Sequence, residues 1–179
     1  VWIGHDWGSP VVWNIAAHHG DKTAGVASLC VPYLAAGFTL ENIVALVDRK
    51  TYPEAEFPVG QWDYQVFYEE SFDKARQGFE ANIRNTVKAL FRKGDPKAAG
   101  KPGRTAFARR NGGMAGPDGF PDVPRDAAVI TEQDLDAYTA ALMRNGFFGP
   151  DSWYMNHKAN GAYSATSKNG GKLAMPVLF

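Results

Sequence analysis

The first ten positions carry residue types that could form a carboxylate nucleophile. Asp6 lies between Gly4 and Gly8, after the apolar residues 1–3 and before an apolar run that begins at Pro10. This order predicts a short buried strand, a sharp turn and a helix. We expect both glycines to be required, because side chains there would collide with the flanking strand and helix. The turn would present the carboxylate of Asp6 for reaction.

A carboxylate at this position narrows the possible chemistry. Attack on an ester would give a mixed anhydride, whereas attack on a saturated carbon gives an alkyl ester of Asp6 that water can hydrolyse. Epoxides, alkyl halides and halo-acids are therefore the suitable substrates. Trp7 could assist with its backbone N–H as an oxyanion-hole donor, or with its indole N–H as a halide ligand. The alternative is that His5-Asp6 only caps the helix, since Asp is a favoured N-cap residue.

Epoxides and halides make different demands on the rest of the site. Epoxide opening leaves an alkoxide, which needs a proton donor on the face opposite the nucleophile. A phenol, with an ordinary pKa of about 10, is protonated at neutral pH and suits this task. A halide needs only N–H donors. Tyrosines occur in two segments that could supply the phenols, residues 63–68 and residues 149–156.

The sequence resembles a known family at these three places. Gly-His-Asp-Trp-Gly at residues 4–8 resembles the elbow shared by epoxide hydrolases and haloalkane dehalogenases of the α/β-hydrolase fold. Residues 63–68 and 149–156 are similar to the two tyrosine segments in the cap of epoxide hydrolases. This resemblance implies that Tyr64 and Tyr154 donate the proton in ring opening. It implies an epoxide hydrolase that acts on a small apolar epoxide through an ester of Asp6.

Two rival interpretations stay open. One is a haloalkane dehalogenase with Trp7 as the halide ligand, because Ser9 after the elbow also suits that family. The other is a non-catalytic binding module with a hydrolase-like fold, against which the retained Asp6 and both cap tyrosines argue. For three other tyrosines we favour a structural role, with the ring buried and the hydroxyl in water; these are Tyr68, Tyr138 and Tyr163.

The pattern of elements predicts an α/β class, an α/β-hydrolase core fragment that carries a mostly helical cap. We expect a core segment with the elbow over residues 1–32, a helical cap over 33–170 and a return to a core strand over 171–179. A helix should follow the elbow over residues 10–19, and a second parallel strand should lie within 25–31. In the cap we expect long helices over residues 71–93 and 132–145 and a short one opened by Pro150. The Gly- and Pro-rich residues 94–125 should form a loop whose basic side chains are solvated.

The composition sets bounds on partners and location. The formal net charge of zero predicts neither a nucleic-acid nor a membrane partner. No cofactor and no metal site are expected, and the oligomeric state cannot be read from the residues. The lone Cys30 favours a reducing, cytoplasmic location.

Because the chain starts inside a strand, we expect it to be the middle of a longer enzyme, without the triad acid, the histidine base or the second oxyanion donor. Alone it could be alkylated once at most.

Overall fold

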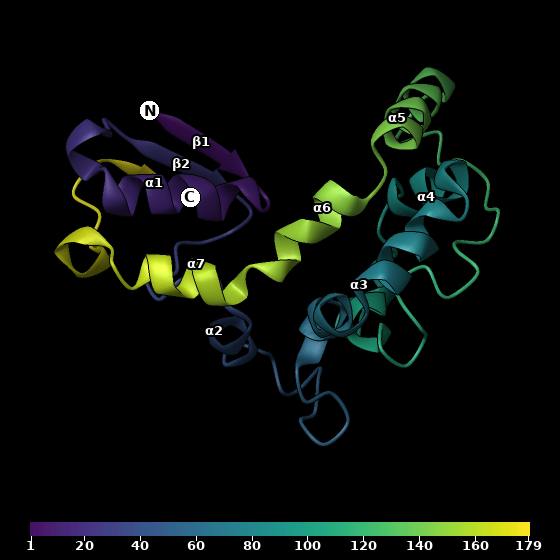
Figure 1. The fold of residues 1–179 in the computed structure, drawn as a ribbon, viewed down its shortest axis with the longest axis horizontal. Helices are drawn as coiled ribbons and strands as arrows, with labels where there is room; N and C mark the ends of the chain where they lie inside the picture. Colours follow the sequence, from purple (N-terminus) through teal and green to yellow (C-terminus); the bar gives the residue numbers. More distant parts are fainter. The chain divides into compact units, whose positions relative to one another are not determined.

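The computed structural model describes residues 1–179, which divide into two compact units (Figure 1). The sheet unit comprises Val1–Ala45 and Asn156–Phe179, and the helical unit comprises Leu46–Met155. The helical unit is shorter than the predicted cap of residues 33–170, because short helices on both sides of it pack within the sheet unit. The predicted domain boundaries themselves remain predictions.

The sheet unit is built on a small parallel sheet in the order β1-β2-β3. Its strands are β1 (Trp2–His5), β2 (Val26–Leu29) and β3 (Val177–Leu178). The helix α1 (Gly8–His18) connects β1 to β2 and packs on the sheet through Val12, Trp13 and Ala16. Trp13 is 2% exposed, and its indole N–H donates to the Val31 carbonyl over 3.0 Å. The α/β class with its strand, turn, helix and parallel strand is confirmed.

Partly buried contacts join α1 to another helix of the sheet unit, α7 (His157–Ser164), which the sequence pattern did not predict. The ring of His18 stacks on Tyr163 with 3.9 Å between centroids. Its Nε2 lies 2.9 Å from the Tyr163 carbonyl, and the Ser164 hydroxyl donates to the Asn14 side chain over 3.2 Å. The helices that flank the helical unit in the chain are α2 (Leu40–Val44) and α7 (His157–Ser164).

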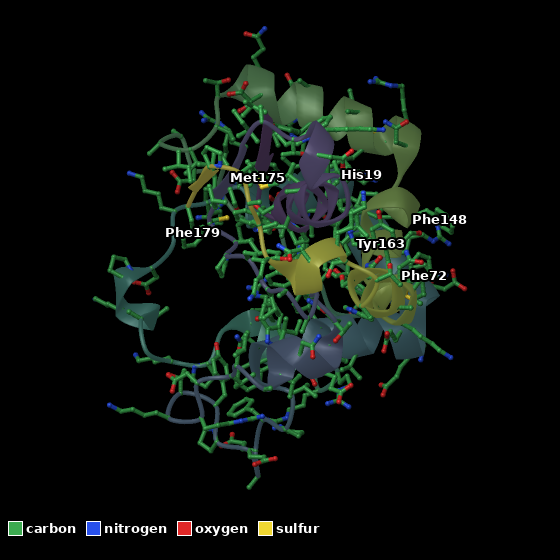
Figure 2. The ribbon with its side chains drawn as sticks, turned by 90° about the vertical axis from the view of Figure 1, so that its left-hand side faces the viewer. His19, Phe72, Phe148, Tyr163, Met175 and Phe179 are labelled. Atoms are coloured by element: carbon green, nitrogen blue, oxygen red, sulfur yellow. The ribbon has the colours of Figure 1, made fainter.

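The helical unit has a core of aromatic side chains. Its helices are α3 (Asp63–Glu80), α4 (Ile83–Leu90), α5 (Glu132–Asn145) and α6 (Phe148–Ser152). Short 3₁₀ helices across the whole chain occupy Gly20–Lys22, Gly60–Trp62, Pro96–Ala98, Arg104–Phe107, Trp153–Met155 and Lys168–Gly171. Outside this core, Phe72 of α3 meets the exposed Phe148 of α6 edge-on, with 5.5 Å between ring centroids (Figure 2). None of the helices is long and apolar enough to cross a membrane.

The single helix predicted over residues 71–93 is wrong. The aromatic segment before it is itself helical, so α3 begins at Asp63. Ser71, the predicted start, is a kink with φ −149° and ψ 46° at which two helices meet within α3, so a helix does begin there. The chain leaves the helix after Glu80, and α4 starts anew with Asn82 as its cap, whose side chain accepts from the Asn85 N–H over 3.0 Å. The apolar stripe continues in phase across this break, which is why periodicity alone joined the two helices.

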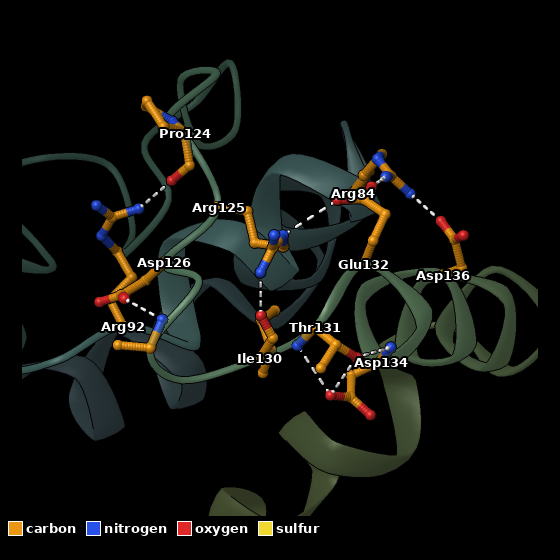
Figure 3. A network of polar contacts seen from close by, with 11 residues as sticks. Arg84, Arg92, Pro124, Arg125, Asp126, Ile130, Thr131, Glu132, Asp134 and Asp136 are labelled. Carbon is orange, nitrogen blue, oxygen red and sulfur yellow. Dashed lines mark hydrogen bonds and ion pairs between the residues drawn. The ribbon is translucent and has the colours of Figure 1, made fainter.

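Ion pairs hold the end of the long loop between α4 and α5 (Figure 3). Arg84 of α4 pairs with Glu132 and, at 2.6 Å, with Asp136, both on α5. The Arg92 guanidinium donates to the Pro124 carbonyl over 2.6 Å. The start of α5 has the predicted capping box, with Thr131 and Asp134 bonded reciprocally.

The basic residues of the loop differ in their roles. Arg109 is exposed, as the predicted solvated surface requires, but it also forms an ion pair, because its Nε lies 2.6 Å from the Asp63 carboxylate. Asp63 is 7% exposed and also accepts the Arg109 backbone N–H over 2.8 Å, so this pair fixes the loop against the start of α3. The guanidinium of Arg110 lies 4.9 Å from the centre of the Phe57 ring. Lys97 and Lys101 are exposed, in agreement with the prediction.

Candidate active site

Asp6 sits in a strained turn between β1 and α1. Its backbone has φ +49°, a left-handed conformation that residues with a Cβ rarely adopt. The Asp6 N–H donates to the Leu29 carbonyl over 3.2 Å, and the Asp6 carbonyl accepts the Ser9 N–H over 2.8 Å. The side chain is exposed. The geometry is that of a strand-to-helix turn that presents its central residue to solvent.

The two glycines around Asp6 do not have the same role. A Cβ on Gly4 would lie 2.5 Å from the Gly8 carbonyl oxygen and 2.8 Å from the Ser9 Cα, so no side chain fits there. A Cβ on Gly8 would meet nothing within 4 Å. The expected collision is therefore confirmed for Gly4 and wrong for Gly8, because β1 approaches the backbone of Gly8 and not the space that its side chain would fill.

This asymmetry gives a prediction for stability. We expect Gly4→Ala to lower the free energy of unfolding by about 3 kcal/mol, the upper range for forcing an extra methyl into a packed site. The matched control is Gly8→Ala, which should be neutral or slightly stabilising because alanine favours a helix. Urea unfolding of both variants measures the difference. Equal losses in the two variants would contradict the steric account of the elbow.

Trp7 follows Asp6 and occupies the N-cap position of α1, with φ −64° and ψ −12°. No side chain caps this helix, so the alternative in which Asp6 serves only as its cap is wrong. The Trp7 ring meets Phe38 edge-on at 6.2 Å between centroids. The backbone N–H of Trp7 belongs to the first turn of α1, at the positive end of the helix dipole, where a negative charge is stabilised.

The helical unit brings Tyr64 and Tyr154 together and adds Tyr68. The rings of Tyr64 and Tyr154 meet edge-on at 5.2 Å between centroids. Tyr68 stacks on Tyr154 at 4.9 Å and lies edge-on to Tyr64 at 5.7 Å. We call these three residues the tyrosine cluster. Tyr64 and Tyr68 lie one turn apart on the same face of α3. Tyr154 comes from the 3₁₀ helix that follows α6.

Two polar neighbours of the cluster were missed by the sequence interpretation. Gln65 is completely buried, and its Nε2 donates to the Tyr64 hydroxyl over 2.9 Å. Asp151 of α6 is 3% exposed, and burial together with the charge of Glu80 raises its pKa to about 7. The predicted structural role of Tyr68 has a buried ring and a hydroxyl group in water. The whole residue is only 4% exposed, which is more buried than that role requires. Burial, and then the charge of Asp151, raises the pKa of Tyr68 far above its ordinary value.

Asp6 and Trp7 belong to the sheet unit, and the tyrosine cluster belongs to the helical unit. Nowhere do three His, Cys, Asp or Glu side chains gather in a way that could hold a metal ion.

The similar proteins described below are all named epoxide hydrolases. No protein-family model matches the chain. Bifunctional epoxide hydrolase 2 of Sus scrofa is 30% identical over 178 residues, which cover 99% of this chain and 29% of that protein. Epoxide hydrolase A of Mycobacterium tuberculosis is 31% identical over 198 residues, which cover 100% of this chain and 52% of that protein. The crystal structure of epoxide hydrolase A from Mycobacterium thermoresistibile matches with a TM-score of 0.65 at 30% identity, over 99% of this chain and 51% of that one.

The chain is homologous to epoxide hydrolases. An epoxide hydrolase structure from Vigna radiata, with a TM-score of 0.58 at 21% identity, supports the fold alone. These relatives do not favour the haloalkane dehalogenase alternative. The chain spans about half or less of the length of the epoxide hydrolases described above.

Proposed function

We propose that the protein carrying this chain opens epoxides to vicinal diols through an alkyl ester on Asp6, with Tyr64 and Tyr154 as proton donors. The observation that carries the proposal is the contact between the two phenol rings, 5.2 Å apart, in a homologue of epoxide hydrolases. A pair of phenols matches the need of an epoxide for a proton at its ring oxygen, whereas a halide has no such need.

The first step forms the ester. A carboxylate oxygen of Asp6 attacks a ring carbon, the carbon–oxygen bond of the epoxide breaks, and the ring oxygen takes a proton from a phenol. In the second step water attacks the ester carbonyl, the bond between the acyl carbon and the diol oxygen breaks, and the diol leaves with a proton from water. The Asp6 carboxylate is regenerated, and the remaining proton of water restores the phenol. The Trp7 backbone N–H, directly after the nucleophile, is suited to stabilise the oxyanion of this second step.

Gln65 orients one of the two donors. Its Nε2 donates a hydrogen bond to the Tyr64 hydroxyl oxygen, so Tyr64 is the acceptor in this bond and its O–H is not used there. The same bond stabilises the phenolate that forms when the proton leaves. Both effects favour proton transfer in the direction that ring opening requires.

The surroundings of the phenols favour an apolar substrate. The tyrosine cluster is part of a core that also contains Phe67, Phe79 and Phe147. Sites lined by aromatic side chains with few polar groups bind apolar ligands and exclude water from reactive intermediates. The proposed substrate is therefore a small apolar epoxide.

Isotope labelling tests the covalent step. In a single turnover in heavy-oxygen water, we expect the first diol to be unlabelled, because its new oxygen comes from the Asp6 carboxylate. The label should enter Asp6 during hydrolysis of the ester, and mass spectrometry of the peptide that contains Asp6 would detect it. Multiple turnovers in the same water provide the control, because later diols should carry the label. Direct labelling of the first diol would mean that water attacks the epoxide itself.

A further inference from the structure

The proposed chemistry leaves one buried acid unexplained. Asp151 of α6 is 3% exposed, and its Oδ2 is buried without a hydrogen-bond partner. A buried carboxylate with an unsatisfied oxygen is costly, and such a group tends to become neutral instead. Asp151 is therefore poised between two charge states inside the helical unit.

The charged neighbours of Asp151 come from α3. Glu80 opposes its ionisation, and Arg76 favours it to a smaller extent. The Arg76 guanidinium is already 2.8 Å from a Glu80 carboxylate oxygen and 3.6 Å from Asp73, so its charge is shared. Glu80 is held in place as an acceptor of the Phe147 N–H over 2.8 Å. Burial and Glu80 together prevail, and the pKa of Asp151 rises to about 7.

Asp151 lies on α6, which packs against α3, the helix that carries Tyr64 and Tyr68. A negative charge on Asp151 is the second cause, after burial, of the raised pKa of Tyr68. Tyr68 stacks on Tyr154 at 4.9 Å and meets Tyr64 at 5.7 Å, so the three phenols share one poorly solvated region. In such a region a charge acts over longer distances than in water.

We propose that Asp151 is a positioning residue for ring opening, which sets the acidity of the tyrosine cluster through its own charge and lets the phenols donate readily only while it is neutral. The inference rests on the proposed function, since the phenols matter only if they protonate an epoxide oxygen. Proton donation leaves a phenolate. A carboxylate at Asp151 opposes that second negative charge, whereas a neutral carboxyl group does not.

The charge state of Asp151 should make the rate of ester formation depend on pH. Asp151 loses its proton as the pH rises through about 7, and the phenols then become weaker acids. The rate of ester formation on Asp6 should therefore fall as the pH rises through this range. We expect a fall of about threefold to tenfold, equivalent to a change of half a unit to one unit in phenol pKa.

The experiment measures pre-steady-state ester formation with an aryl epoxide from about pH 5 to about pH 9. In the unsubstituted protein that carries this chain, the rate of ester formation should fall near pH 7. Asp151→Asn should keep the faster, low-pH rate across the range, because its side chain is always neutral. Glu80→Gln should move the midpoint to lower pH, because the charge that raises the pKa of Asp151 is gone. The amide oxygen of this variant can still accept the Phe147 N–H.

The outcomes separate this inference from the proposed function. Loss of ester formation in all three proteins would overturn the function itself. Ester formation with an unchanged pH profile in Asp151→Asn, or with an unmoved midpoint in Glu80→Gln, would overturn the role of Asp151 alone. Carbon-13 NMR of the Asp151 carboxyl group gives a readout independent of activity, in which the titration midpoint should be near pH 7. A midpoint in the ordinary aspartate range, about pH 4, would also overturn the role.

Discussion

Replacement of both Tyr64 and Tyr154 by phenylalanine is expected to slow epoxide opening by about 10⁴-fold, the upper range for loss of acid catalysis. No donor would then remain to meet the alkoxide. Each single change should cost less, about tenfold to a thousandfold, because the partner phenol can cover for the missing one. Pre-steady-state ester formation with an aryl epoxide measures the three rates.

Two controls sharpen this result. Tyr138→Phe is the matched control, because Tyr138 is 45% exposed and stacks on Phe91, away from the tyrosine cluster. It should leave the rate unchanged. Trp7→Phe tests the dehalogenase alternative, with a 1-haloalkane assayed beside the epoxide. If the double tyrosine variant keeps its activity while Trp7→Phe loses halide release, the epoxide assignment is wrong.

Loss of the Asp6 carboxylate should be at least as damaging. We expect Asp6→Ala to reduce turnover by about 10⁴-fold or more, the scale seen when a nucleophile is removed from an enzyme that forms a covalent intermediate. When the reaction of the unsubstituted protein is stopped early, the peptide that contains Asp6 should carry the added mass of one epoxide. The variant should carry none.

A surface carboxylate provides the comparison for Asp6. Asp21→Asn removes an exposed carboxylate of the same sheet unit and should keep both the turnover and the adduct. An adduct of full yield in Asp6→Ala would place the nucleophile elsewhere, and the function of the elbow would have to be reconsidered.

Local patterns predicted the parts of the fold that short segments determine. The turn at Asp6 follows from an apolar strand, a glycine and a helix-forming run in immediate succession, and the start of α5 follows from the Thr131 capping box. The break between α3 and α4 could not be found in this way. Apolar residues stay in phase across it, and only the cap at Asn82 distinguishes two helices from one. Asn is a favoured N-cap residue, but one such residue inside an unbroken apolar periodicity does not by itself predict a boundary.

In the candidate site, too, some residues could be predicted from short segments and others could not. Resemblance supplied Asp6, Tyr64 and Tyr154, because each lies in a short recognisable segment. Tyr68 and Asp151 could not be predicted, since their properties depend on burial by elements far apart in the chain. One signal was available: Tyr68 follows Tyr64 by four residues, a spacing that places both on one face of a helix. No spacing reveals that Asp151 is 3% exposed.

The left-handed backbone of Asp6 has an evolutionary consequence. At φ +49° a residue with a Cβ destabilises the fold relative to glycine, by about 1 kcal/mol. Under the proposed function, Asp6 is therefore a position where the fold is kept below its stability optimum because the reaction needs a carboxylate there. Mutant libraries screened for thermal tolerance alone should become enriched in glycine at this position, and each such variant would lack the carboxylate. Screens for a hardier form of this protein therefore need to assay activity at every round.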